Sequence, residues 1–312
     1  MSALVSDEAF AAALAAARPG AALREGPGPL ASPSYLALES RSALVDAGEG
    51  PLFLKVIHPE MAAGFDLAAA VALARAAGAA GVGPEVLWAD PARGALLMRA
   101  LTVGWRTAKL HDLQDPAVQA AAAAALRRLH GTAPLAARFD AFAEIDRLAA
   151  EAMAADVALP EDLGWIRTLL AEARAPLLAG RLAPCRNDGS ASNLMVSDQG
   201  AVMLIDFDRA GMNDPLYDLG ALMAETTDFE EDMAPLFLAY AGEWDARAFA
   251  RARLWAIVDD VMHALCARVH GARSVRRSVE WLKYGEWRLM RARLALHHPQ
   301  FEAKLRAIGG AA

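Results

Sequence analysis

The chain has 312 residues, 55% of them hydrophobic, and a formal net charge of −7 from 31 basic and 38 acidic side chains. This size is sufficient for two lobes with large cores, whereas the acidic balance argues against a nucleic-acid platform, which needs a basic face. No apolar run has the length of a membrane span, and the two cysteines lack metal-ligand spacing, so we expect a cytoplasmic protein with free thiols and no membrane partner.

Residues 1–101 are expected to form a small N-terminal, nucleotide-binding lobe with a leading helix. Asp7 and Glu8 stand where a secretory signal carries positive charge, which favours an opening amphipathic helix. Short apolar or alternating runs separated by turn formers predict antiparallel strands; these runs are SYLALES, ALVDAG, PLFLKVI, PEVLWAD and GALLMRAL. The stretch FDLAAAVALARAAGAAG, which ends at Gly81, predicts the one main helix of this lobe.

Residues 102–312 are expected to form a larger, mostly helical lobe beyond a hinge at 101–106. Helical patterns cover 117–129, 142–155 and 163–180, and they resume after residue 208. Between them, two short apolar runs flank SDQG and predict a β-hairpin in NLMVSDQGAVMLIDFD. The predicted fold class is therefore α+β, with a small antiparallel sheet in one lobe and mostly helices in the other.

Polar residues at the two ends of that hairpin have the chemistry of phosphoryl transfer. Asp188 lies five positions before Asn193, which opens the hairpin, and Asp206 follows its second strand. Amide and carboxylate oxygens suit Mg²⁺, and a carboxylate left free of the metal can accept a proton from a hydroxyl group. In the alternative interpretation, these are ordinary turn residues and a strand exit.

The same segment resembles a known family. CRNDGSASN followed by LIDFDRAGMNDPLYDLG is similar to the signature of the choline kinase and aminoglycoside phosphotransferase superfamily, relatives of the protein kinases. Cys185, Asn187 and the DFD sequence favour the choline/ethanolamine kinase-like branch, and RRLH, LKYGEWRLMRARL and LFLKV extend the resemblance over residues 35–294. The resemblance implies a protein-kinase-like two-lobe fold, with ATP and Mg²⁺ as cofactors.

The resemblance also implies roles for individual residues. Asp188 is expected to be the catalytic base, and Asn193 and Asp206 are expected to bind the metal. Asp208 is expected to be an outer-shell or second-metal group. Asp218 is expected to tie down the catalytic loop.

Nucleotide-binding residues are expected in the N-terminal lobe. Lys55 lies among apolar neighbours in FLKVI, which favours an inward ammonium that holds the ATP phosphates; the alternative is a surface lysine at a strand edge. Met98, before the hinge, and Ser32, in the proline-stiffened loop GPGPLASPSY, are also predicted at the nucleotide. The glutamate that usually pairs with this lysine is missing: its position falls near Ala70, so either Asp66 replaces it or Asp66 is only an acid of the first helical turn.

Arg186 stands where the family usually has a histidine that supports the catalytic loop. A guanidinium has a fork of donors that can replace this support, and its charge stabilises the ionised form of Asp188. We therefore group Arg186 with the catalytic residues. In the alternative interpretation, the arginine, the missing glutamate and the stiff loop indicate a catalytically impaired, pseudokinase-like nucleotide-binding protein.

Aromatic and acidic residues of the C-terminal helices predict a pocket for an ammonium group, which aromatic faces and carboxylates attract. The predicted pocket residues are Trp255, Asp259, Asp260, Trp281, Tyr284 and Trp287, with Glu225 at the substrate mouth. The alternative is an aromatic stripe in the helical core and a solvent-facing glutamate.

These patterns together predict an ATP- and Mg²⁺-dependent kinase that phosphorylates a hydroxyl group of a small cationic amino-alcohol resembling choline or ethanolamine. An aminoglycoside phosphotransferase, which needs a wide acidic pocket, is the alternative within the enzyme class. The patterns predict no nucleic-acid partner, and they do not indicate an oligomeric state.

Overall fold

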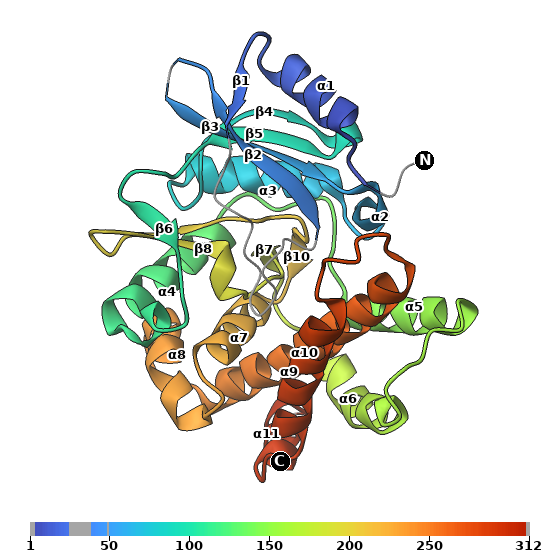
Figure 1. The fold of residues 1–312 in the computed structure, drawn as a ribbon. Coiled ribbons are helices and arrows are strands. Elements are labelled where there is room, and N and C mark those ends of the chain that lie inside the picture. The colour runs from blue at the N-terminus through green and yellow to red at the C-terminus, as the bar shows by residue number, and fades with distance from the viewer. Residues whose placement is uncertain (1–3, 25–38, 49, 310–312) are drawn as a thin grey trace.

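A five-stranded antiparallel sheet in the order β1-β2-β3-β5-β4 forms the upper lobe in Figure 1. The structure is a computed structural model that describes residues 4–24, 39–48 and 50–309. The strands are β1 (Ala22–Arg24), β2 (Ser40–Asp46), β3 (Pro51–Ile57), β4 (Val86–Asp90) and β5 (Ala95–Arg99). Helix α1 (Asp7–Ala17) packs on one face of the sheet, and α3 (Leu67–Ala79), which follows the single turn α2 (Pro59–Ala62), lies toward the lower lobe.

Alternation along β3 explains how the sheet presents a lysine to the lower lobe. Leu52, Leu54 and Val56 are buried in the cluster that packs against α1. Because successive side chains of a strand point to opposite faces, Phe53 and Lys55 point the other way. Both line a cleft whose other walls include residues of the lower lobe.

Helices make up most of the lower lobe, with the long helix α9 at its centre. They are α4 (Pro116–His130), α5 (Ala141–Ala154), α6 (Leu163–Leu178), α7 (Pro215–Thr226), α8 (Ala234–Ala241), α9 (Ala246–Arg273), α10 (Trp281–Leu296) and α11 (Phe301–Gly309). Helix α9 packs against α5, α6, α7, α10 and α11. Among the described residues, no helix has the length and apolar character needed to cross a membrane.

Two small antiparallel sheets carry the segment that resembles the kinase signature. One contains β6 (Trp105–Thr107), β8 (Leu194–Ser197) and β9 (Val202–Leu204), and the other contains β7 (Ala183–Cys185) and β10 (Gly211–Asn213). In the β8–β9 hairpin Leu194 pairs with Leu204. Just beyond that pair, the backbone N–H of Ile205 donates to the backbone carbonyl oxygen of Asn193 at 3.1 Å. This register brings the residues that precede β8 close to those that follow β9.

Most elements predicted from the sequence are confirmed. The α+β class, the upper sheet with its main helix, the long helices and the β8–β9 hairpin all appear. The run SYLALES lies largely outside the described residues, and only its last residue, Ser40, belongs to a described strand. Strands β1, β6, β7 and β10 were not predicted, because three residues outside a hairpin pattern are too few to show a period. The lobe boundary at residue 101 stays a prediction.

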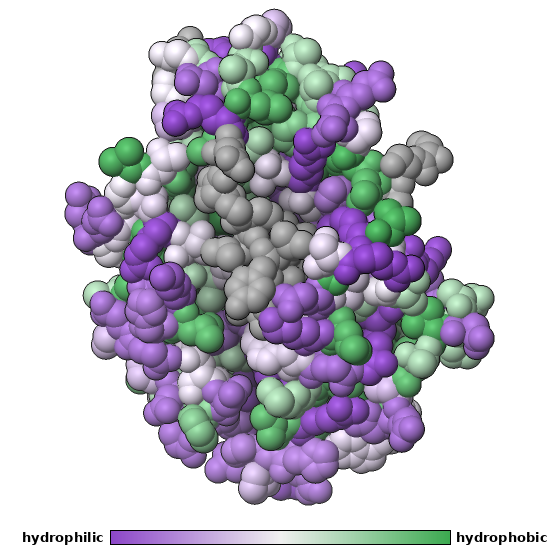
Figure 2. All heavy atoms as spheres, in the orientation of Figure 1, coloured by the Kyte–Doolittle hydropathy of each residue, from purple (hydrophilic) through white to green (hydrophobic). Residues whose placement is uncertain are grey.

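Apolar side chains on the surface are dispersed. On the face shown in Figure 2, hydrophilic residues are spread over both lobes, with hydrophobic residues in small groups among them. The most exposed large apolar residues include Val103, Met153 and Phe229, which come from separate parts of the chain. Single exposed apolar residues are normal on a protein surface, so they do not indicate a docking site.

The packing of α7 on α9 depends on Gly220. A Cβ atom at this position would collide with the backbone of Ala252, which cannot move aside without displacing α9. We expect Gly220→Ala to lower the free energy of unfolding by about 3 kcal/mol. In the control Gly164→Ala, the new methyl group meets no atom within 4 Å, so we expect a change below about 1 kcal/mol. Chemical denaturation measures both values, and equal stabilities would contradict the packing argument.

Candidate active site

The predicted catalytic loop, residues 186–193, connects β7 to β8 and is held by a buried carboxylate. The backbone N–H groups of Arg186 and Asn187 donate to the two oxygens of Asp218 on α7, at 3.0 and 2.8 Å. His130, the last residue of α4, lies 3.0 Å from Asp218 through Nε2. Asp218 is 1% exposed, so the expectation that it ties down the loop is confirmed.

Arg186 supports the backbone of this loop. Its side chain is buried, and Nη1 donates to the carbonyl oxygens of Asn193 at 2.8 Å and Ile205 at 3.2 Å. These two carbonyls lie at the open end of the β8–β9 hairpin. The guanidinium therefore links the loop to the hairpin, and we interpret Arg186 as a support rather than as a reacting group.

Two residues of the site have left-handed backbone conformations, which are uncommon outside glycine. Asn187 has φ +56° and Asp206 has φ +61°. The side chain of Asn187 is fixed on both sides, since it accepts from Asn213 at 2.8 Å and donates to the carbonyl of Arg209 at 2.8 Å. Such conformations persist where surrounding contacts enforce them, often at functional sites.

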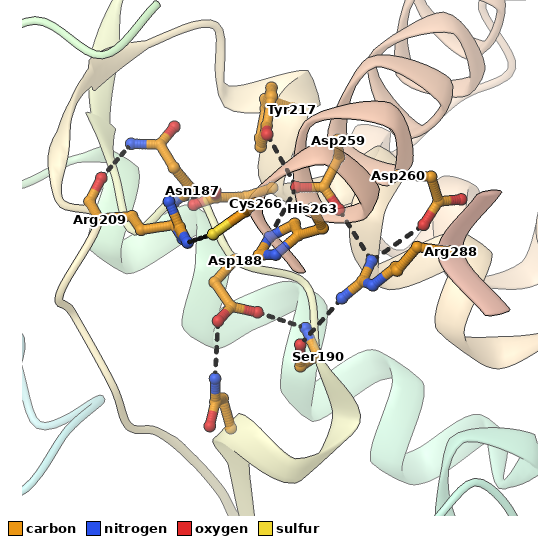
Figure 3. Close-up of polar contacts among 12 residues, drawn as sticks. Asn187, Asp188, Ser190, Arg209, Tyr217, Asp259, Asp260, His263, Cys266 and Arg288 are labelled. Atoms are coloured by element: carbon orange, nitrogen blue, oxygen red, sulfur yellow. Dashed lines mark hydrogen bonds and ion pairs between the residues drawn. The ribbon is translucent and has the colours of Figure 1, made fainter. Parts of the chain in front are cut away.

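Asp188 is oriented by the loop that follows it. Its carboxylate accepts from the backbone N–H of Ser190 at 2.7 Å and from Nδ2 of Asn193 at 2.8 Å. Figure 3 shows the contact with Ser190, and above it Asp259 and Asp260 of α9. Since the amide nitrogen of Asn193 faces Asp188, its amide oxygen points away from Asp188. This orientation suits an asparagine that binds a cation.

The charge state of Asp188 is that of a proton acceptor. Burial raises the pKa of this carboxyl, but the Arg186 guanidinium and the hydrogen bonds from Ser190 outweigh burial and hold the pKa well below its usual range. Asp188 is therefore ionised at neutral pH, as a general base must be.

Lys55 of β3 lies between the two aspartates of LIDFD. Its Nζ donates to Asp206 Oδ1 at 2.8 Å. The same nitrogen lies 2.7 Å from Asp208 Oδ2; this second contact is an ion pair whose angles are not those of a hydrogen bond. Burial lowers the pKa of Lys55, but the two carboxylates raise it above its usual range. Burial and the neighbouring Asp206 also raise the pKa of Asp208. One ammonium thus faces two carboxyl groups that repel each other when both are ionised, and a cation bound to Asp206 would relieve this repulsion.

Asn193 and Asp206 fit a Mg²⁺ ion. Both line, together with Lys55, a cleft of about 180 Å³. Their amide and carboxylate oxygens are the hard ligands that Mg²⁺ prefers, and a bound phosphate and water complete its coordination in kinases. Asp208, which was predicted as a further metal group, does not line this cleft. It contacts Lys55 beside two small cavities that Ala70 of α3 also lines.

The other walls of this cleft suit an adenine ring. Apolar side chains line much of the cleft; they include Leu44, Phe53, Met98, Met195 and Ile205. Met98 pairs with Phe53 in the β3–β5 register, so it lies beside the predicted nucleotide. Ser32, which was also predicted there, lies outside the described residues.

Asp66 is not the partner of Lys55. Its carboxylate caps α3 by accepting from the backbone N–H of Ala69 at 2.9 Å, and the residue is exposed. Ala70, where the family's glutamate was expected, is buried and lines two small cavities that Lys55 and Asp208 also line. Of the two interpretations of Asp66, the role as partner of Lys55 was therefore wrong and the role as an acid at the start of the helix is confirmed, because an N-cap carboxylate is directed to the first turn of its own helix.

Two tryptophans predicted in the acceptor pocket lie elsewhere. Trp255 is 1% exposed, donates from Nε1 to Asp214 at 3.0 Å and packs on Tyr217. Trp281 stacks on His270 and lines a groove at the C-terminal end of α9. Both predictions were wrong, because these rings lie on the packed faces of α9 and α10.

The predicted acids of the pocket are neutralised by arginines of α10. Arg288 Nη1 lies 3.0 Å from both Asp259 and Asp260, and Arg291 forms an ion pair with Glu225. Asp259 and Glu225 are 1% and 5% exposed. Glu225 is therefore not at a substrate mouth, and Asp259 has no exposed carboxylate for an ammonium group.

The same arginines cover the remaining aromatic rings. The guanidinium of Arg288 lies 5.3 Å from the ring centres of Tyr284 and Trp287, and that of Arg291 lies 4.5 Å from the ring of Trp287. The hydroxyl group of Tyr284 lies 3.0 Å from Nδ1 of His263. Arginine therefore occupies the cation–π positions that were predicted for a substrate, and only Trp287 keeps a partly exposed side.

Comparison with known proteins agrees with this geometry. Residues 37–255 match the model of the phosphotransferase enzyme family. The chain belongs to this family. The resemblance predicted from the sequence is thereby confirmed.

Two solved structures and one further relative are similar to this family member. A choline/ethanolamine kinase family protein from Mesorhizobium loti is 27% identical, with a TM-score of 0.79 over 98% of this chain and 99% of that chain. A choline kinase from Streptococcus pneumoniae is 17% identical, with a TM-score of 0.70 over 86% and 92%, so it shows the fold alone. A thiamine kinase from Escherichia coli is 35% identical over 95 residues, which are 30% of this chain and only 34% of that kinase.

Two charged residues near the site of this phosphotransferase family member were not predicted from the sequence. Arg209 is buried, lies 3.8 Å from Glu39 and stacks on Phe65. Burial raises the pKa of Glu39 to about 7; Arg209 opposes this shift, and Asp206 and Asp188 add to it. The one feature of the sequence that could have indicated a role for Arg209 is its position directly after DFD. No feature of the sequence indicated a role for Glu39.

Asp218 offers a test of how the loop is held. In Asp218→Asn, an amide NH₂ replaces one oxygen that accepts from the loop, so a buried backbone N–H loses its partner. We expect the free energy of unfolding to fall by about 3 kcal/mol. The control Asp198→Asn makes the same change at an exposed turn and should cost less than about 0.5 kcal/mol. Denaturation curves give both values; a stable Asp218→Asn variant would show that the loop does not depend on this carboxylate.

Proposed function

We propose that this protein is an ATP- and Mg²⁺-dependent kinase that transfers the γ-phosphate to a hydroxyl group of a small molecule. One observation carries the proposal: Asn193 donates to Asp188 and also lines, with Asp206 and Lys55, the cleft between sheet and hairpin. Membership of the phosphotransferase enzyme family supports it.

The proposed mechanism assigns each of these residues a separate task. Asn193 and Asp206 would bind Mg²⁺, which supplies charge neutralisation at the phosphates. Lys55 donates to the phosphates of the nucleotide from the sheet side. Asp188, oriented by Ser190 and Asn193, would accept the proton of the acceptor hydroxyl as the hydroxyl oxygen attacks the γ-phosphorus. The bond from that phosphorus to the β,γ-bridging oxygen breaks in the same step, and ADP leaves.

The proposed acceptor is a small cationic alcohol. The choline/ethanolamine kinase family protein that matches nearly the whole chain supports this class, and so does the partial match to thiamine kinase. Choline, protonated ethanolamine and thiamine each combine a positive charge with a hydroxyethyl group. Glu39, whose side chain is 21% exposed and whose pKa responds to Asp188, is the acid that we propose for the positive group.

A screen of acceptors tests this function. We expect the purified protein with Mg-ATP to consume ATP when choline, ethanolamine or thiamine is added, and not with neutral sugars of similar size. Consumption with aminoglycosides alone would replace the proposed acceptor class. Binding of Mg-ATP without consumption across the panel would instead favour the pseudokinase-like alternative.

Removal of the proposed base tests the mechanism. Asp188→Asn keeps the size of the side chain but cannot accept the hydroxyl proton, so we expect kcat to fall by about 10³-fold with nearly unchanged affinity for Mg-ATP. Phosphate transfer and calorimetric ATP binding measure the two quantities. Asp198→Asn, in an exposed turn, serves as the control and should leave both unchanged. Loss of ATP binding in Asp188→Asn would mean that its role is wrongly assigned.

A further inference from the structure

The proposed function leaves Lys55 without an obvious fixed partner. A lysine ammonium on a flexible stem must be held in one direction to bind phosphates well. Asp206 cannot hold it if Asp206 also binds the metal. The position on α3 where an acid was expected carries Ala70, and Asp66 is occupied as a helix cap.

The two aspartates that contact Lys55 lie in different surroundings. Asp206 lines the same cleft as Asn193, and its side chain is 26% exposed. The side chain of Asp208 is 11% exposed. It lines two small cavities whose walls include Ala70 but not Asn193; Asp206 also lines one of them, but not the other, which Leu67 and Val71 of α3 line. Asp208 thus approaches the lysine from the side of α3, and Asp206 approaches it from the side of the predicted metal.

We infer that Asp208 replaces the missing helix acid as the fixed partner of Lys55, which releases Asp206 for the metal. Asp208 is then a positioning residue, because it acts through Lys55 and does not touch the nucleotide. This inference rests on the proposed function, since it concerns the lysine that binds the phosphates.

Charge balance supports this division. One ammonium lies against two carboxyl groups, and these repel each other when both are ionised. A cation bound to Asp206 removes this repulsion, so that Lys55 and Asp208 remain as a matched pair. The backbone N–H of Asp208 lies 3.4 Å from Asp206 Oδ1, which keeps the two carboxylates in a fixed relation on either side of the lysine.

Moving the carboxylate back to α3 tests the inference. In Asp208→Ala, Lys55 keeps only Asp206, where it competes with the metal, so we expect the affinity for Mg-ATP to fall about tenfold. In Asp208→Ala with Ala70→Glu, a carboxylate enters the cavities beside Lys55, and the affinity should return to within about threefold of the parent protein. The matched control, Asp208→Ala with Ala70→Gln, adds the same volume without charge and should stay weak. Isothermal calorimetry of the full chain measures all three.

A double-mutant cycle of Asp208→Ala and Lys55→Met tests the same inference if the variant that carries Ala70→Glu does not fold. If Asp208 acts only through Lys55, Asp208→Ala should change Mg-ATP affinity less than about twofold in a Lys55→Met background, because the partner is already gone. If Asp208 binds metal, the full tenfold loss should persist in that background, which would overturn the inference.

The remaining outcomes are also decisive. An unchanged affinity in Asp208→Ala, or equal affinities in the folded glutamate and glutamine variants, would overturn the role of Asp208. Failure of the parent protein to bind Mg-ATP would overturn the proposed function itself. The binding measurement therefore separates the two proposals without knowledge of the acceptor.

Discussion

The ion cluster of Lys55, Asp206 and Asp208 is the interaction on which the arrangement of the two lobes at the cleft depends. The ammonium comes from the sheet of the upper lobe, and both carboxylates come from the segment after the β8–β9 hairpin. Two local features make the meeting possible: the alternation of β3, which points Lys55 away from α1, and the left-handed backbone of Asp206. The repulsion between the two carboxyl groups is the reason why a further cation suits this site.

A second set of buried contacts fixes the catalytic loop behind this cluster. Asp218 accepts two backbone N–H groups, while Arg186 donates to two backbone carbonyls. The loop is therefore held both at its start and where it enters the hairpin. A loop fixed in this way presents Asp188 and Asn193 without further rearrangement, which is the kind of preorganisation that phosphoryl transfer requires. Arg186 thus supports the loop and also places a positive charge near Asp188, which helps to hold the pKa of that carboxyl below its usual range.

The side chains that were predicted to form an acceptor pocket are instead held in buried ion pairs and ring contacts. Charges buried in an apolar interior must be paired, and the acids of α7 and α9 are paired with Arg288 and Arg291 of α10. The same arginines lie over Tyr284 and Trp287. Residues whose sequence pattern predicts a recognition pocket therefore stabilise the helical lobe. Glu39, whose side chain is 21% exposed, is the acid that we propose for a positive group of the acceptor.

The sequence by itself determined the fold class, the hairpin and the order of Asp188, Asn193 and Asp206, because periodicity, turn residues and short spacings are local properties of the chain. It also predicted that Lys55 points inward, since its neighbours in FLKVI are apolar. Only the tertiary structure decided what each charge is paired with: Asp66 caps its own helix, Asp208 joins Lys55, and Glu225 joins Arg291. Ion pairing depends on distances between residues far apart in the chain and on the burial that makes an unpaired charge costly, and neither is written in the local pattern.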